Sequence, residues 1–269
     1  VAQKGRWGRI GKDGPVVIPI QYDDLYPFAG GLARVKTGQK WGYIDRNGDM
    51  AISPDYETAA SFSQGLAVVM KDDAMGYIDR SGRVVTPLCY AHAYSLQEGM
   101  GLVEYQDKCG FVDRQGRLTD WSRAPESERE IDDGQAVPSV INLDASRFRF
   151  QQAYSFSEGL APVCLGEQWG YMDETGKIAI SPRYENAGEF VDGIAVVVYQ
   201  GKWGLIDRLG HEIVEPKYGY IGNAHMHGRA FHQGLAMVER DGGVGFIDER
   251  GRLVIAPDYA EANHFSEGL

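Results

Sequence analysis

Long hydrophobic runs, basic patches and paired cysteines are all missing from this chain of 269 residues. No apolar stretch approaches the roughly 18 residues that a membrane-spanning helix needs, so we expect no membrane insertion. With 27 basic and 38 acidic residues, the formal net charge is −11, and no basic patch interrupts it. Because a field of that sign repels phosphates, the composition argues against nucleic acid as a partner.

Cysteine is scarce. Cys89, Cys109 and Cys164 are odd in number and have no C-x-x-C spacing, which predicts buried or partly buried thiols. Unpaired thiols and the lack of a visible signal peptide slightly favour a cytoplasmic location. The chain nevertheless looks like an excerpt, since it begins and ends inside the repeats described below.

Catalytic motifs are absent as well. The sequence has no G-x-S-x-G, no phosphate-binding P-loop, no G-x-G-x-x-G after a strand and no H-E-x-x-H. Most aspartates recur at one turn position, where capping of the backbone explains them. We therefore expect a protein that is not an enzyme and that carries no cofactor.

Glycine, in contrast, is abundant, with 35 residues, and its positions recur. An apolar residue followed at once by glycine returns every 34 residues, apart from two longer intervals, at Trp7, Trp41, Met75, Cys109, Trp169, Trp203 and Val244. In six of the seven copies an aspartate follows, and three residues later comes another glycine. Asp45-Arg46-Asn47-Gly48 therefore predicts a type I turn that closes a β-hairpin.

The second half of each copy is equally regular. It holds a proline, which we expect to end a strand, then an aromatic residue, a phenylalanine or leucine, and a further glycine. Alternation along Trp41–Ile44 puts Trp41 and Tyr43 on one face and Gly42 and Ile44 on the other. The recurrent glycine predicts close approach of a neighbouring ring or backbone. The recurrent aromatics are best explained as a core between repeats.

The fold class that follows is all-β, with tandem 34-residue repeats of three short strands and an irregular corner. Because so short a meander cannot bury its apolar face alone, each copy must pack on the next. We predict one tandem-repeat domain over residues 1–269, arranged as an open, curved β-solenoid-like array. A closed seven-bladed β-propeller is the alternative.

The strings KWGYID, FSQGLAVV, QWGYMD and GKWGLID resemble the WG (or KWG) repeat of bacterial proteins. Seven copies in register carry the resemblance over nearly the whole chain. It implies a repeat fold and a binding habit, and it offers no catalytic residues. Three copies depart from it by replacing the tryptophan with Met75, Cys109 or Val244, which keeps an apolar residue and fits a packing role.

Two insertions, at about residues 120–145 and 222–230, interrupt the 34-residue spacing and are the predicted places of interaction. The first is strongly acidic and the second contains a His-x-His pair, too few ligands to predict a metal site. The candidate interaction residues are Trp121, Glu126, Glu128, Asp132, Asp133, His225 and His227.

The repetition without a catalytic motif predicts a non-catalytic scaffold that binds an unidentified protein or peptide. The alternative is a module for carbohydrate or cell-wall glycan that uses exposed repeat aromatics. In that case Tyr43 and Tyr171 would contact the sugar.

Overall fold

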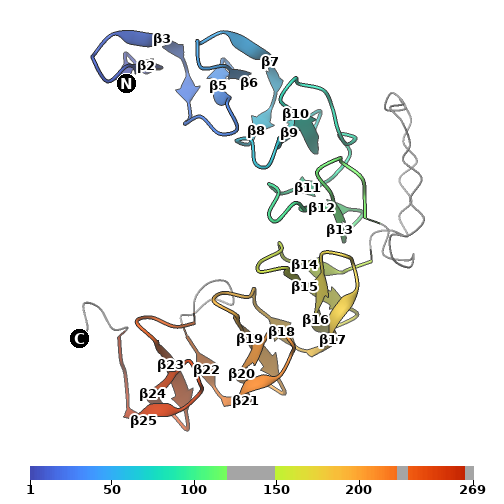
Figure 1. Cartoon of the computed structure of the whole chain (residues 1–269), viewed down its shortest axis with the longest axis vertical. Coiled ribbons are helices and arrows are strands. Elements are labelled where there is room, and N and C mark those ends of the chain that lie inside the picture. The colour runs from blue at the N-terminus through green and yellow to red at the C-terminus, as the bar shows by residue number, and fades with distance from the viewer. Residues whose placement is uncertain (120–148, 223–229, 264–269) are drawn as a thin grey trace. The chain divides into compact units, whose positions relative to one another are not determined.

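The computed structural model describes residues 1–119, 149–222 and 230–263, and all regular structure in these residues is β-strand (Figure 1). This confirms the all-β repeat fold. The described residues contain no helix long and apolar enough to span a membrane. The chain divides into two compact units, unit 1 (Val1–Arg149) and unit 2 (Phe150–Leu269). A single continuous domain, and an open rather than a closed array, stay predictions.

The strands of unit 1 are β1 (Ala2–Gln3), β2 (Arg6–Ile10), β3 (Val16–Tyr22), β4 (Asp24–Leu25), β5 (Ala33–Thr37), β6 (Lys40–Ile44), β7 (Met50–Tyr56), β8 (Thr58–Ala59), β9 (Leu66–Lys71), β10 (Ala74–Asp79), β11 (His92–Ala93), β12 (Gly101–Tyr105) and β13 (Lys108–Val112). Those of unit 2 are β14 (Gln152–Ala153), β15 (Leu160–Leu165), β16 (Gln168–Asp173), β17 (Ile178–Tyr184), β18 (Asn186–Ala187), β19 (Ile194–Tyr199), β20 (Lys202–Asp207), β21 (Glu212–Tyr218), β22 (Tyr220–Ile221), β23 (Leu235–Arg240), β24 (Gly243–Asp248) and β25 (Leu253–Tyr259).

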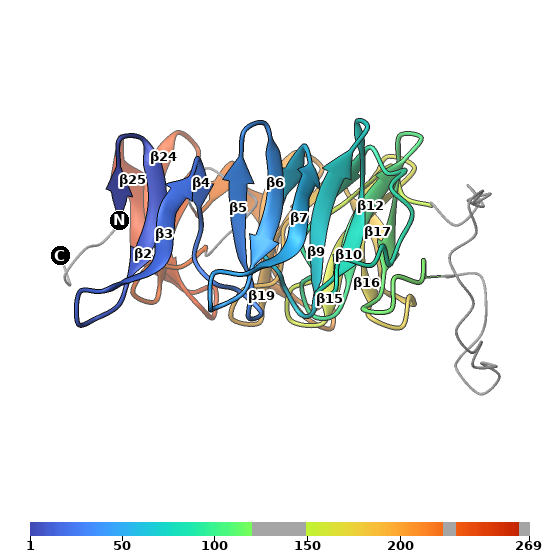
Figure 2. The same cartoon turned by 90° about the horizontal axis from the view of Figure 1, so that it is seen from above.

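Each repeat folds into one small antiparallel sheet whose strands are joined by turns at its two ends (Figure 2). We number the sheets in chain order: sheet 1 (β1–β3), sheet 2 (β4–β7), sheet 3 (β8–β10), sheet 4 (β11–β13), sheet 5 (β14–β17), sheet 6 (β18–β21) and sheet 7 (β22–β25). The three predicted strands are present in sheet 2 as β5, β6 and β7. The corner adds a fourth, since β4 pairs with β5 through Asp24 and Leu25.

The sequence predicted that the recurrent proline would end its strand, and this prediction is wrong. Pro54 lies inside β7, where the register shifts between the pairs Trp41–Tyr56 and Tyr43–Ile52. A bulge tolerates proline because its extra residues make no ladder hydrogen bond. The bulged backbone comes close to Gly42: a Cβ there would lie 2.5 Å from the Ile52 carbonyl oxygen and 2.7 Å from the Pro54 nitrogen. The close approach predicted for this glycine is confirmed, and the neighbour is backbone.

The predicted turn at Asp45–Gly48 is confirmed. The Gly48 amide donates to the Asp45 carbonyl at 3.1 Å, and Gly48 has a φ of +89°, which glycine adopts without strain. A second turn precedes the first long strand in each of sheets 2 to 7. Its sequence is Phe-Ser-x-Gly in sheets 3 and 5, and we call it the F-S-x-G turn in all six sheets. In sheet 3, Gln64 and Gly65 have φ of +49° and +98° between the bridged residues Ser63 and Leu66, as in a type I′ turn.

The core lies between successive sheets. Tyr43 and Ile44, neighbours on β6, are both fully buried but on opposite sides. Ile44 packs with Ile18, Ala33 and Val35 between sheets 1 and 2. Tyr43 packs between sheets 2 and 3 in a cluster that includes Phe62. A sheet inside a unit therefore has two buried faces, and the alternation seen in the sequence separates two cores.

Candidate functional site

The sequence-predicted interaction residues all lie outside the described part of the chain. Trp121, Glu126, Glu128, Asp132 and Asp133 fall in residues 120–148, and His225 and His227 fall in residues 223–229. The insertions stay predicted places of interaction. The accessible surface of the described residues is therefore the place to look for a site.

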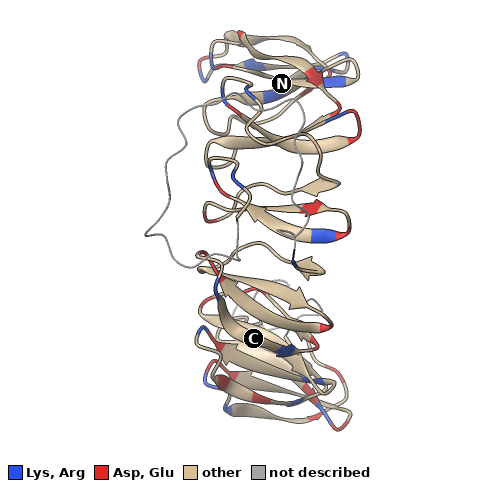
Figure 3. Ribbon diagram, turned by 90° about the vertical axis from the view of Figure 1, so that its right-hand side faces the viewer, with Lys and Arg blue, Asp and Glu red and all other residues tan. Residues whose placement is uncertain are grey.

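That accessible surface is formed largely by the turns at the two ends of each sheet, where the charged residues gather (Figure 3). We call one end the Asp-turn rim: it carries the turns that begin at the repeat aspartate, such as Asp45–Gly48, and the F-S-x-G turns, such as 62–65. The other end, the hairpin rim, carries the tips between the two long central strands, such as Gly38–Gln39.

The aspartates of the Asp-turn rim are engaged by their own turns. Asp45 Oδ1 accepts from the amides of Asn47 and Asp49 at 2.9 and 3.0 Å. The same two contacts recur at Asp79, Asp113, Asp173, Asp207 and Asp248. Hydrogen bonds from the Arg252 side chain and from backbone amides hold the pKa of Asp248 below its usual range. These carboxylates cap turns, as predicted.

The F-S-x-G turns connect successive sheets, a role that the sequence did not reveal. Ser63 Oγ donates to the Leu96 carbonyl of sheet 4 at 2.9 Å. Gln64 Oε1 accepts from the Gly99 amide at 2.7 Å and from Arg114 Nη2 at 3.0 Å, both in sheet 4. The recurring serine and the long polar residue after it were the available signal.

Unit 2 repeats the ladder. Ser157 Oγ donates to the Phe190 carbonyl at 2.7 Å, and Glu158 Oε2 accepts from the Gly193 amide at 2.9 Å. The turn of one sheet thus binds the turn of the next through the same two positions in both units.

The hairpin rim carries aromatic pairs. Trp41 lies 5.7 Å from Tyr26, whose ring is also covered by the Arg34 guanidinium at 3.7 Å. Trp169 stacks on Tyr154 at 5.0 Å with an interplanar angle of 11°. Core packing accounts for some of these tryptophan positions and not for others. Trp169 is buried, Trp41 is half-buried and Trp7 is exposed.

The tyrosines that were expected to meet a sugar are in the core. Tyr43 and Tyr171 are fully buried, and their hydroxyls donate to the carbonyls of Ala60 and Gly188 at 2.7 and 2.8 Å. Desolvation raises the pKa of both phenols above its ordinary value. The aromatics that stay exposed at the rims are others, among them Tyr94 and Tyr199.

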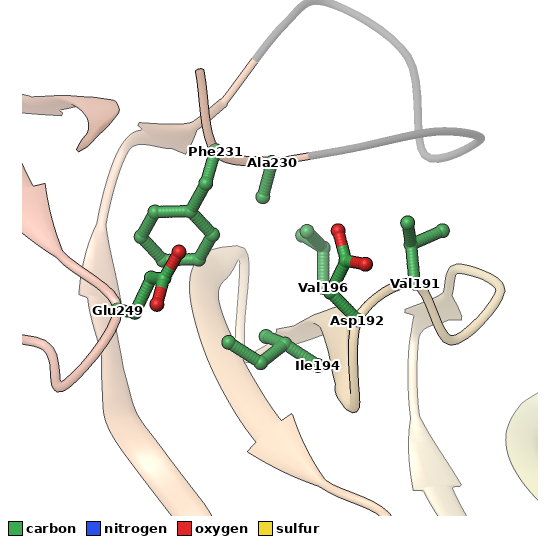
Figure 4. A pocket seen from close by; sticks show the side chains of 7 residues that line it. All are labelled: Val191, Asp192, Ile194, Val196, Ala230, Phe231 and Glu249. Carbon is green, nitrogen blue, oxygen red and sulfur yellow. The ribbon is translucent and has the colours of Figure 1, made fainter. Parts of the chain in front are cut away.

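A small cavity of about 60 Å³ opens between sheets 6 and 7 (Figure 4). Five apolar residues line it together with two acids, Asp192 and Glu249. Asp192 belongs to the F-S-x-G-type turn of sheet 6, whereas Glu249 follows the turn aspartate Asp248 of sheet 7. It is a concave site with paired negative charge.

Metal and thiol chemistry find little support on the described surface. Within residues 1–119, 149–222 and 230–263, no three His, Cys, Asp or Glu side chains are grouped to hold a metal ion. Cys164 is buried, and Cys89 and Cys109 are half-buried, so the predicted thiols are confirmed. Burial raises the pKa of the Cys89 thiol to about 11, which lowers its reactivity.

Comparison with known families and structures gives one specific match. The model of the WG containing repeat matches residues 7–41, 41–73, 75–109, 146–169, 169–203, 203–243 and 245–269. No curated protein matches the chain in sequence.

Among solved structures, Hsv2p of Kluyveromyces lactis is similar at 9% identity and a TM-score of 0.40, over 84% of this chain and 73% of that one. A eukaryotic initiation factor is similar at 11% identity and a TM-score of 0.44, over 87% of this chain and 65% of that one. PorZ of Porphyromonas gingivalis is similar at 8% identity and a TM-score of 0.34, over 90% and 34% of the two chains. Likenesses this weak add nothing to what the sheets themselves say about the fold.

Proposed function

Because this chain belongs to the family of WG containing repeats, we propose that it is a non-catalytic module that binds a protein or peptide partner. One observation carries the proposal: the polar groups that recur between copies are used inside the fold. The turn aspartates accept hydrogen bonds from backbone amides, and the core tyrosines donate hydrogen bonds to carbonyls of the next sheet. Side chains at the rims also differ between copies, and a partner would contact them there.

The charge of unit 2 supports a polypeptide partner with basic groups. In unit 2, residues 150–222 and 230–263 contain 16 acidic and 8 basic residues, whereas residues 1–119 of unit 1 contain 14 of each. Electrostatic complementarity steers encounter and sets orientation more than it sets affinity. A basic partner would therefore approach unit 2 first, and its binding would weaken as salt screens the charges.

The proposal is tested by capture with the full chain as bait, followed by titration of each recovered protein in purified form. Direct binding that weakens between low and high salt is the expected result. Recovery of no protein that binds directly, at either salt concentration, would contradict the proposed function. A turnover of substrate by the isolated chain would contradict its non-catalytic character.

Two sets of substitutions separate the insertions from the rims. One replaces Trp121 by Ala together with Glu126→Gln, Glu128→Gln, Asp132→Asn and Asp133→Asn, and the other is His225→Asn with His227→Asn. Asp107→Asn, on an exposed hairpin tip of unit 1, is the matched control. Loss of the partner in the first set alone would assign binding to residues 120–145. Unchanged binding in both sets would assign it to the rims.

Glycan binding is the second candidate, and the exposed rim tyrosines are the observation in its favour. Tyr26 and Tyr94 occupy the same repeat position and are 39% and 49% exposed. Aromatic faces of this kind can stack on a sugar ring, although Arg34 already covers Tyr26. Sedimentation with peptidoglycan, lost on Tyr94→Ala and retained on Tyr199→Ala, would favour this candidate over a protein partner.

A further inference from the structure

Sheet 1 carries a charged residue at a position where the other sheets carry core residues. Arg9 occupies the repeat position that is filled in sheets 2 to 7 by buried side chains: Tyr43, Tyr77, Phe111, Tyr171, Leu205 and Phe246. The Arg9 guanidinium lies 4.8 Å from the centre of the Phe28 ring of sheet 2. At the next junction the corresponding pair is Tyr43 and Phe62, with ring centres 4.9 Å apart. The arginine therefore brings positive charge into the junction between sheets 1 and 2.

An open groove lies beside this arginine. Its volume is about 370 Å³, and it is lined by Arg9, Ile10, Val17 and Ile18 of sheet 1 and by Phe28 and Arg46 of sheet 2. Sites for small ligands occupy roughly 300–1,000 Å³. Ile10 and Val17 are 46% and 47% exposed, so the apolar part of the groove is accessible. The groove is therefore large enough for the end of a peptide.

Arg9 and Arg46 give this groove two guanidinium groups. In residues 1–119, 149–222 and 230–263, no ion pair includes either of them. Asp45, the acid next to Arg46 in the chain, accepts hydrogen bonds from amides of its own turn. Residues 1–56, which form sheets 1 and 2, contain eight basic and six acidic residues, although the whole chain has a net charge of −11. The groove thus offers an anion two forked donors in a locally positive field.

We propose that this groove binds the C-terminal carboxylate of a protein or peptide partner whose last side chain is apolar. Arg9 and Arg46 donate hydrogen bonds to the carboxylate, whose two oxygens match the planar fork of a guanidinium. The apolar side chain covers Ile10 and Val17 and removes their surface from water. The inference rests on the proposed function, since it names the group that a polypeptide partner would offer.

A chain end fits this groove better than an internal acidic residue. At a C-terminus the carboxylate and the apolar side chain are attached to the same Cα, so both enter one short groove together. An internal Asp or Glu brings the carboxylate, and a neighbouring residue has to supply the apolar group from another direction. The two sources of a carboxylate can therefore be distinguished by short peptides.

The test titrates the full chain with the peptide acetyl-Gly-Gly-Leu, which has a free carboxylate. Three comparison peptides end in leucine amide, end in serine with a free carboxylate, or carry the acid internally as acetyl-Leu-Asp-Gly-amide. The methyl resonances of Ile10 and Val17 report occupancy, and that of Ile206, buried in unit 2, is the reference. We expect the leucine carboxylate to bind about tenfold more tightly than each comparison peptide.

Equal affinity for any one of the three comparison peptides would overturn the inference. A shift of the Ile10 and Val17 resonances on dilution of the chain alone would also overturn it, because a second copy of the chain would then occupy the groove.

Arg9→Tyr restores the aromatic residue that sheets 2, 3 and 5 have at this position. We expect this variant to bind the leucine peptide at least about tenfold more weakly. Its unfolding temperature should stay the same or rise, because the new ring can pack on Phe28 as the equivalent rings pack at the next junction. Arg46→Gln, in an exposed turn, should weaken binding several-fold and leave the fold unchanged.

Arg83→Gln is the matched control, since Arg83 is an exposed arginine that pairs with Asp79 in sheet 3, outside the groove. It should bind the leucine peptide like the wild-type chain. Full affinity in folded Arg9→Tyr or Arg46→Gln would overturn the inference, as would an equal loss in Arg83→Gln.

The two proposals fail separately. If the leucine peptide binds in the groove but no protein partner binds the chain directly, the proposed function is wrong and the carboxylate site stands. If a partner binds equally to the wild-type chain, to Arg9→Tyr and to Arg46→Gln, the carboxylate site is wrong and the proposed function stands.

Discussion

The phenol of Tyr43 donates a hydrogen bond of 2.7 Å to the carbonyl oxygen of Ala60, which belongs to the next sheet. Tyr77 does the same to Tyr94 at 2.6 Å, and Tyr171 to Gly188 at 2.8 Å. In each case the acceptor lies 17 residues beyond the donor. One side chain thus fills the core between two sheets and also fixes their register, which explains why an aromatic with a polar tip recurs there.

Tyr43→Phe should lower the free energy of unfolding by about 1–2 kcal/mol, because it leaves the Ala60 carbonyl without its donor while keeping the ring. Urea denaturation followed by circular dichroism measures the change. Tyr26→Phe is the control, since that ring is 39% exposed. A loss for Tyr43→Phe no larger than for Tyr26→Phe would mean that the hydrogen bond contributes nothing.

Gly42→Ala should destabilise the protein by about 3 kcal/mol or more, because the new Cβ would collide with rigid backbone at Ile52 and Pro54. Gly38→Ala is the matched control on the same hairpin. Gly38 has a φ of +64° and open space around it, so alanine there should cost only about 1 kcal/mol of backbone strain. Chemical denaturation of both variants compares crowding with strain, and equal losses would contradict the steric account.

The buried tyrosines should make the fold sensitive to alkali. Desolvation raises the pKa of Tyr43, Tyr77, Tyr90 and Tyr171 above its ordinary value in the folded protein. Since the unfolded chain releases these protons near pH 10, their contribution to stability is complete below that pH. It is lost as pH rises towards the folded pKa values.

Tyrosinate absorbance after a jump to high pH measures this effect. The exposed tyrosines should ionise at once, and the buried ones only at the rate of unfolding. Tyr171→Phe should remove one phenol from the slow phase and none from the fast one. If all tyrosines ionised within the mixing time while the circular dichroism stayed native, the burial of these hydroxyls would be refuted.

Much of the repeat could be predicted from the sequence, because its rules are local. Turn chemistry at Asp45–Gly48 and the alternation along β6 depend on neighbours within a few residues, and both predictions hold. The two-residue strand β4 was missed because two residues carry no periodicity. The bulge at Pro54 was missed because its cause, the absent Cβ of Gly42, lies on another strand.

The candidate site at the junction of sheets 6 and 7 shows a different limit. Glu249 is visible in the sequence, but its neighbour across the junction is not. Only the packing of sheets brings it to one cavity with Asp192. The sequence therefore directed attention to the insertions, whereas the described residues direct it to the cavity between sheets 6 and 7.

The tryptophans should differ sharply in their accessibility to a soluble quencher. Trp169 is 5% exposed and stacked on Tyr154, whereas Trp7 is 42% exposed. In variants that keep one tryptophan and replace the other four by Phe, iodide should quench Trp7 several-fold more strongly, and the emission of Trp169 should be blue-shifted. Denaturation in urea should abolish the difference, which serves as the control. Equal quenching of the two native variants would contradict the burial of Trp169. That side chain would then be exposed and available to stack on a sugar.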